Sequence, residues 1–369
     1  MEQVAADERP RPSLWKRPWK PVAGYIALMS GLATLYTAFD LTWFKGVSSE
    51  VFGVGLLLLG SIVVVQLTII IDQHESRPGG NVNGEQSLHD AIVVALRAQF
   101  NRHNYSDVIR VGEALSRPLF ESGAFSPRLQ IGKMVEESAA RSSRTREQYS
   151  ALIDSIGWSL VELGRYADAD RQIKHGLRLA ESAEDAFYEA KAHRHLGVIA
   201  RRQGRFAEAR EMYATAEAVA SRIPDEHDRL VMLAGLQYAL ASLSYYEKHF
   251  EVASTEISRA IDSFTSLGDE YRLNMARVMQ GDIQFQQGAR DDARDTYRLV
   301  LQNSDRNKET LQYVRACLGL AEARAADHEW EDTAQALRLL AGLNLNEYKA
   351  ERERRDAIHA MLPGAVTER

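Results

Sequence analysis

Residues 163–176 read LGRYADADRQIKHG, and residues 203–216 read QGRFAEAREMYATA. In both stretches a Gly is followed by a basic residue, then by an aromatic residue, and an Ala comes three positions after the aromatic. A large apolar side chain, Ile173 or Tyr213, follows four positions after that Ala. The same spacing recurs after about 40 residues, which indicates that one structural unit is repeated along the chain.

The spacing of Gly, aromatic residue and Ala has a simple physical meaning. A Gly ends a helix easily because it adopts a positive φ without a steric penalty. The aromatic residue then opens a second helix and packs back on the first, and the Ala lets the two helices approach closely. Alternating β-branched runs are almost absent, and apolar residues fall at helical spacing. Neither helix of such a pair can bury its apolar stripe alone, so we predict an all-α stack of helix pairs.

Further copies follow the first two. The third has Lys248 and Phe250 at the turn, the fourth has Gly288 and Ala293, and a fifth, degenerate copy contains Gly319 and Trp330. These offsets resemble the tetratricopeptide repeat family in its long form of about 40 residues, with clear copies over 148–302. The resemblance implies an α-solenoid whose first helices line a groove for a peptide or protein. Residues 88–120 hold a possible early copy, with Tyr105 at the aromatic position, and 126–142 resemble an extra helix.

Two segments near the amino terminus are apolar throughout and carry no charge. Residues 21–39 read PVAGYIALMSGLATLYTAF, and residues 51–71 read VFGVGLLLLGSIVVVQLTIII. Each has about the 20 residues that a helix needs to span a hydrocarbon layer of roughly 30 Å. A buried core helix or a signal peptide is the alternative, but no cleavage pattern of small residues follows the first segment. We therefore expect an N-terminal transmembrane helical hairpin.

The charges around these segments predict an orientation. The residues before the first segment include Arg9, Arg11, Lys16, Arg17 and Lys20, whereas the loop between the segments carries only Lys45. The positive-inside bias places the amino terminus in the cytoplasm, and the hairpin returns the chain to the same side. We expect a protein of the inner (cytoplasmic) membrane with both termini and the repeats in the cytoplasm. The lone cysteine, Cys317, fits a reducing compartment.

The expected domain order follows from these observations. We predict a basic cytoplasmic tail at 1–20, the hairpin at 21–71, a flexible linker at 72–87, the TPR-like repeats at 88–343, and a charged capping helix with a tail at 344–369. Within the first span, Ala23, Ala27 and Gly31 recur every four residues, which allows a second helix to approach closely. This face either packs against the second span of the same chain or makes homo-oligomers.

The repeat offsets also predict which side chains face the groove. They are Trp158, Lys191, Arg194, Arg201, Tyr238, Ser242, Tyr245, Asp282 and Phe285. Aromatic and arginine residues dominate the energetics of protein interfaces, so these residues are our candidate partner-binding site. The alternatives are that the aromatics pack between repeats and that the basic cluster around Arg194 and Arg201 is a solvated face.

The sequence contains few residue patterns that indicate catalysis or metal binding. It has no phosphate-binding loop and no motif of a metalloprotease, a zinc finger or a serine hydrolase, and we expect no catalytic residues, cofactor or metal. Glu189 and His193 are four residues apart on one predicted helix, an arrangement that is more simply an exposed helix pair than a metal site. The formal net charge of −6 argues against a nucleic-acid partner, which needs a concentrated positive face.

Two hypotheses remain open at this point. The first is a membrane-anchored interaction scaffold or sensor, not an enzyme, that binds a protein or peptide on the cytoplasmic face. The second is a membrane-disrupting two-helix effector, of the kind found in bacterial antiviral defence or toxin systems, controlled by the repeats as a sensor. Ion pathways usually need charged groups inside the membrane, and both spans lack them, so a transporter is disfavoured.

Overall fold

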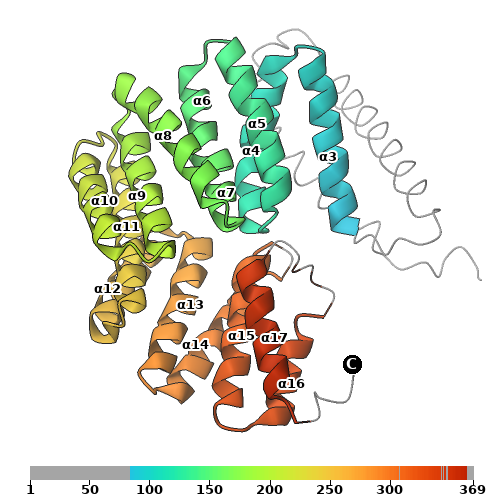
Figure 1. Ribbon diagram of the computed structural model, residues 1–369, viewed down its shortest axis with the longest axis vertical. Helices are drawn as coiled ribbons and strands as arrows, with labels where there is room; N and C mark the ends of the chain where they lie inside the picture. The colour runs from blue at the N-terminus through green and yellow to red at the C-terminus, as the bar shows by residue number, and fades with distance from the viewer. Residues whose placement is uncertain (1–83, 307, 342, 344, 346–347, 364–369) are drawn as a thin grey trace, which may run out of the picture. The chain divides into compact units, whose positions relative to one another are not determined.

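The computed structural model describes residues 84–363 except 307, 342, 344 and 346–347. Every element of this part is a helix (Figure 1). The elements are α3 (Gly84–Asn101), α4 (Tyr105–Glu121), α5 (Phe125–Arg141), α6 (Thr145–Ser150), the π-helical segment η3 (Ala151–Trp158), α7 (Ser159–Glu162), α8 (Tyr166–Ser182), α9 (Ala186–Arg202), α10 (Phe206–Ala220), α11 (Glu226–Tyr246), α12 (Phe250–Leu267), α13 (Glu270–Gln286), α14 (Arg290–Asn303), α15 (Thr310–Ala325), α16 (Trp330–Arg338) and α17 (Lys349–Met361).

The membrane prediction falls outside this part of the chain. The spans at 21–39 and 51–71, with the packing face of Ala23, Ala27 and Gly31, lie outside the described residues. From residue 84 onward, the described helices include none with the length and apolar character needed to cross a bilayer. Helix α3 begins at Gly84, inside the segment predicted as a linker.

The repeated sequence forms repeated helix pairs. In the first copy, α6, η3 and α7 run on as one first helix, and α8 is the second. The pairs α9 and α10, α11 and α12, α13 and α14, and α15 and α16 follow, and each helix packs on its neighbours in chain order (Figure 1). Upstream, α3 and α4 form the early pair expected from Tyr105, and α5 is the extra helix expected over 126–142.

The turns explain why Gly recurs in the sequence. Gly164, Gly204 and Gly288 have φ angles of 74°, 75° and 83°, in the left-handed region where a side chain is costly. In the third copy Lys248 adopts the same conformation with a φ of 65°, although it carries a side chain. The turn geometry is therefore retained where the Gly is not.

Small residues inside the first helices serve a second purpose, which is close packing. A Cβ atom added to Gly197 of α9 would lie 2.4 Å from the ring of Tyr213, which is fully buried on α10. Tyr297 of α14 blocks Gly281 of α13 and Gly319 of α15 in the same way, at 2.6 and 2.3 Å. One tyrosine ring can thus occupy the space that two glycines leave open.

The last helix does more than close the end of the stack. Helix α17 packs chiefly on α15, where Arg354 pairs with Glu322 at 2.6 Å, and it reaches Asp282 of α13 at 3.3 Å. Because α13 and α15 are first helices of their copies, α17 covers the face formed by first helices, which we call the inner face. Just before α17, Tyr348 donates a hydrogen bond of 3.1 Å to the carbonyl of Ser122, so the chain end also meets α4 and α5.

Candidate functional site

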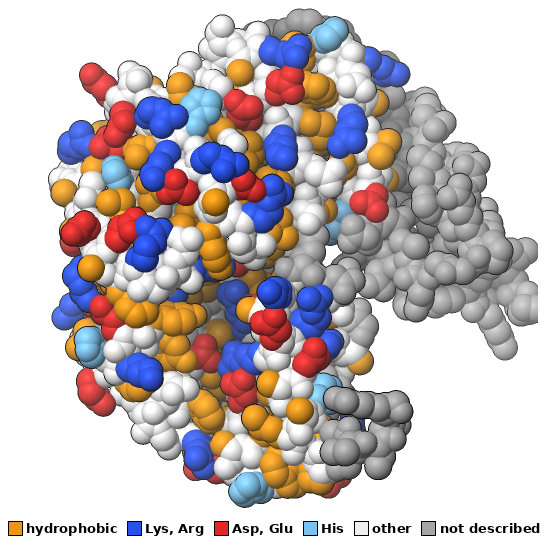
Figure 2. Space-filling view, in the orientation of Figure 1, with side chains coloured by type: hydrophobic (Ala, Val, Ile, Leu, Met, Phe, Trp, Pro, Cys, Tyr) orange, Lys and Arg blue, Asp and Glu red, His pale blue; other side chains and the backbone are white. Residues whose placement is uncertain are grey.

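A cavity of about 440 Å³ opens on the inner face. Its walls come from the continuous helix of α6, η3 and α7, from α9, α11 and α13, from Arg315 of α15, and from the upstream helices α4 and α5. Figure 2 shows the molecule hollowed between its upper and lower helices, with Lys and Arg side chains beside the hollow. The lining contains eight Lys and Arg residues: Arg117, Arg128, Lys191, Arg194, Arg201, Arg202, Arg272 and Arg315. It contains four acidic residues: Glu113, Glu147, Asp154 and Glu162.

One wall contains the π-helical segment η3. A π-turn displaces backbone carbonyls from the usual helical ladder, and such turns are frequent at functional sites. Here the guanidinium of Arg128, only 6% exposed, donates to the carbonyl of Asp154 at 2.8 Å and to that of Ser116 at 2.9 Å. Arg128 therefore ties α5 to α4 and η3. Burial lowers the pKa of this guanidinium to about 10, so it stays charged at neutral pH.

Most carboxylates around the cavity are already paired with a cation. Lys191 of α9 donates to Asp154 at 2.6 Å. Burial alone would raise the pKa of Asp154, but the ammonium of Lys191 holds it below its ordinary value, so this pair is ionised. Glu162 accepts from Arg202 at 2.7 Å and lies 3.8 Å from Arg315. Arg315 in turn donates to Glu351 of α17 at 2.7 Å, which joins the cavity wall to the last helix.

Arg194 lies in the middle of this arrangement. Burial first, and the nearby Arg272 next, lower the pKa of Arg194 to about 10, so it too is charged at neutral pH. Burial, and then the charge of Arg194, lower the pKa of His195 well below its ordinary value, and this imidazole is neutral. The ring of His195 packs against Trp158 of η3 with 4.6 Å between centroids and an angle of 42° between the ring planes, and both rings line the cavity beside Arg194.

Six of the nine side chains predicted to face the groove line this cavity. They are Trp158, Lys191, Arg194, Arg201, Tyr238 and Ser242. Tyr245, Asp282 and Phe285 do not line it. Asp282 accepts a hydrogen bond of 2.7 Å from Tyr297 and pairs with Arg354, and Tyr245 packs on Phe250 with 5.8 Å between ring centroids. These three lie toward the copies that α17 covers.

Sequence reasoning missed several residues of the cavity. Arg128, Arg272 and Arg315 were not among the candidates, because they lie in the extra helix or at positions that repeat offsets alone do not distinguish. A signal for the paired charges does exist in the sequence. Lys191 follows Asp154 by 37 residues and Arg202 follows Glu162 by 40, close to one repeat length. Opposite charges one repeat apart on first helices would have indicated these ion pairs.

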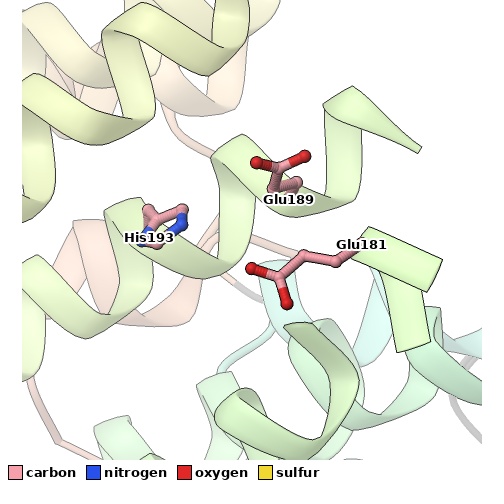
Figure 3. Close-up of side chains that lie close together, drawn as sticks. All are labelled: Glu181, Glu189 and His193. Atoms are coloured by element: carbon pink, nitrogen blue, oxygen red, sulfur yellow. The ribbon is translucent and has the colours of Figure 1, made fainter. Parts of the chain in front are cut away.

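A second cluster of polar side chains lies outside the cavity. Figure 3 shows Glu181 of α8 together with Glu189 and His193 of α9. One donor atom of each lies within 4.8 Å of the others. The carboxylate of Glu189 also accepts from Arg222 at 2.5 Å, so a cation of the chain itself already neutralises part of the cluster. This pairing with Arg222 favours a structural role for Glu189, although Glu189 and His193 are half-buried and not the exposed helix pair expected from the sequence.

The comparisons with known proteins concern the fold. No protein-family model matches the chain, and no curated protein matches it. The chain is similar to the crystal structure of a Rap protein complexed with competence and sporulation factor, with 12% identity and a TM-score of 0.51, over 73% of this chain and 81% of that chain. This similarity shows that the described residues have a TPR-like helical repeat fold.

Two further solved structures are more distantly similar. The apo form of RapI has 9% identity and a TM-score of 0.47, over 76% of this chain and 83% of that chain. BtubC (BKLC) from P. vanneervenii has 17% identity and a TM-score of 0.42, over 73% of this chain and 94% of that chain.

Proposed function

We propose that this chain is an interaction module that binds a peptide or a segment of a protein in the cavity of its inner face. In the full proposal the module is anchored to the inner membrane by the hairpin at 21–71, has its repeats in the cytoplasm, and is not an enzyme. The cavity is the observation that supports peptide binding. The charge-free spans and the basic residues before them support the second part.

The cavity has the properties of a binding site for a short segment. Its volume of about 440 Å³ lies within the range of roughly 300 to 1,000 Å³ that is typical of ligand pockets. Its walls combine aromatic rings, such as Trp158, Tyr188 and Tyr238, with arginines, which are the residue types that contribute most to binding energy. They come from several copies of the repeat, so a bound segment would contact more than one helix pair.

A peptide-retention experiment tests the proposal. The full chain, purified in detergent, would be incubated with a random hexapeptide library, and the retained peptides would be identified by mass spectrometry. We expect a defined subset to be retained by the wild type and lost with Met275→Trp, because Met275 lines the cavity and the larger indole would take up part of the space that a peptide needs. Val252→Trp is the matched control, since Val252 is 51% exposed on α12. Equal retention by both variants, or none by the wild type, would refute peptide binding in the cavity.

A further inference from the structure

Helix α9 presents a row of cations to the cavity. Lys191, Arg194 and Arg201 are separated by three and seven residues, so all three lie on one face of the helix. Lys191 is neutralised by Asp154 at 2.6 Å, and the next residue after Arg201, Arg202, is neutralised by Glu162 at 2.7 Å. The two arginines between these pairs, Arg194 and Arg201, form no ion pair with any described carboxylate.

The guanidinium of Arg194 has a defined position, but its hydrogen-bonding groups are largely without partners among the described residues. In the part of the chain that the structure describes, its one polar contact is the ring nitrogen Nε2 of His195 at 3.4 Å, and its buried Nε has no hydrogen-bond partner. Room for this group comes from Gly235 of α11, where an added Cβ would lie 2.1 Å from Nη1 of Arg194. The backbone of α11 therefore admits the charged group to the cavity.

Arg201, two turns further along α9, is also a buried arginine whose Nε has no hydrogen-bond partner among the described residues. It is 9% exposed. Its guanidinium lies over the ring of Tyr246 at 4.7 Å from the centroid, a contact that orients the charge without neutralising it. A buried cation normally has an anionic partner, because removing a charge from water is costly.

The remaining charges near the cavity do not supply that partner. Arg272 adds a second positive charge beside Arg194 and is itself paired with Asp269 at 2.5 Å. The carboxylates of Asp154 and Glu162 are held by Lys191 and Arg202, as described above. The chain is acidic overall, yet this cavity keeps an excess of positive charge that its own carboxylates do not balance.

We infer that the cavity selects a peptide segment that carries a carboxylate, and that this carboxylate binds the guanidinium of Arg194, while the charge of Arg201 two turns further along α9 adds to the attraction. The inference rests on the proposed function and specifies the ligand of the same site. Charge-assisted hydrogen bonds from a guanidinium to a carboxylate are about twice as strong as neutral ones, and they exclude ligands with a basic group at that position. The carboxylate has two possible sources, an acidic side chain or the carboxyl terminus of the peptide.

Three peptide libraries separate these sources. All are N-acetylated hexapeptides with random flanks. The first has a central Glu and an amide end, the second a central Gln and an amide end, and the third a central Gln and a free carboxyl end. Retention by the full chain in detergent would be compared with that of Arg194→Gln, Gly235→Ala and the control Arg178→Gln, which removes an exposed charge from α8.

We expect the wild type to retain the first or the third library at least tenfold better than the second. Arg194→Gln should abolish this preference, and Arg178→Gln should keep it. Gly235→Ala should also reduce it, because the new methyl group displaces a movable guanidinium end and not the core of the fold. Circular dichroism of each variant would confirm that the helices are intact.

The outcomes distinguish the two levels of the proposal. Equal retention of all three libraries by the wild type, or an unchanged preference in Arg194→Gln, would overturn the carboxylate inference and leave peptide binding in place. Retention of no library by the wild type would overturn both. A melting temperature raised by inorganic phosphate but by no peptide, and only when Arg194 is present, would show that the site takes a small phosphate-type anion, and it would also overturn the inference.

Discussion

The two ends of the inner face differ in whether their buried arginines have a carboxylate partner. At the α17 end, Arg354 pairs with Glu322 and Asp282, and Arg315 pairs with Glu351, so each arginine has a carboxylate from another helix. At the α9 end, Arg194 and Arg201 line an open cavity with no carboxylate partner among the described residues. Helix α17 lies on one end, and none of the described helices lies on the other in this way.

This difference separates two roles of the same residue type. A buried arginine with its donors satisfied holds helices together, and its removal leaves unpaired groups behind. A buried arginine without a partner lowers the stability of the free chain, and it is expected where a ligand supplies the missing charge. The two roles can be told apart by how substitutions change the free energy of unfolding of the full chain in detergent.

The largest loss is expected from Arg128→Ala, at the wall of the cavity. The change leaves the carbonyls of Ser116 and Asp154 without their donor and opens a void, because Arg128 is 6% exposed. We expect the free energy of unfolding to fall by about 3 kcal/mol. Urea unfolding followed by circular dichroism would measure it. A loss below about 1 kcal/mol would mean that the π-turn does not need Arg128.

A smaller loss is expected from Arg354→Ala, at the α17 end. The side chain is 27% exposed, so water partly screens its pairs with Glu322 and Asp282. We expect a loss of about 2 kcal/mol and faster proteolysis within α17. If α17 instead stays protected from proteolysis and the unfolding midpoint is unchanged, its apolar contacts through Ile358 hold it in place. The ion pairs of Arg354 would then contribute little to stability.

The next effect depends on pH and concerns His195. Its pKa in the folded chain lies below the value of about 6.5 in the unfolded chain, so the unfolded state binds the proton more readily. The contribution of His195 to the free energy of unfolding is therefore fully present above about pH 6.5. It falls as the pH drops below that value, by at most about 1.4 kcal/mol per pH unit. His195→Gln should flatten this slope between pH 7 and 5.5, while Arg194, Lys191 and Asp154 around it stay in place. An identical slope in both chains would assign the pH dependence to other groups.

Much of the fold could be predicted from the sequence, because its signals are local. The Gly at 164, 204 and 288 predicted turns with a positive φ, and the structure has them there. Lys248 shows the limit of this rule, because the turn persists without the Gly. The apolar spacing predicted helix pairs, and the helical-repeat prediction is confirmed by the similarity in fold.

The candidate site was harder to predict because it depends on distant pairs. The charged segment containing Arg354 has the local pattern of a capping helix, and only its pairing with Asp282, 72 residues away, places it on the inner face. Arg128 reaches η3 from a helix that does not follow the repeat pattern. Six of the nine residues chosen from repeat offsets line the cavity, but the offsets did not show which part of the inner face α17 covers.

The most direct test of the account is the free energy of unfolding of Arg194→Gln without a ligand. Arg194 has no ion pair among the described residues and lies beside the like charge of Arg272, so its removal should relieve a cost. We predict that the variant is as stable as the wild type within about 0.5 kcal/mol, or more stable. A loss of about 2 kcal/mol or more would show that Arg194 supports the fold as Arg128 does, and would contradict the claim that its charge is kept for a ligand.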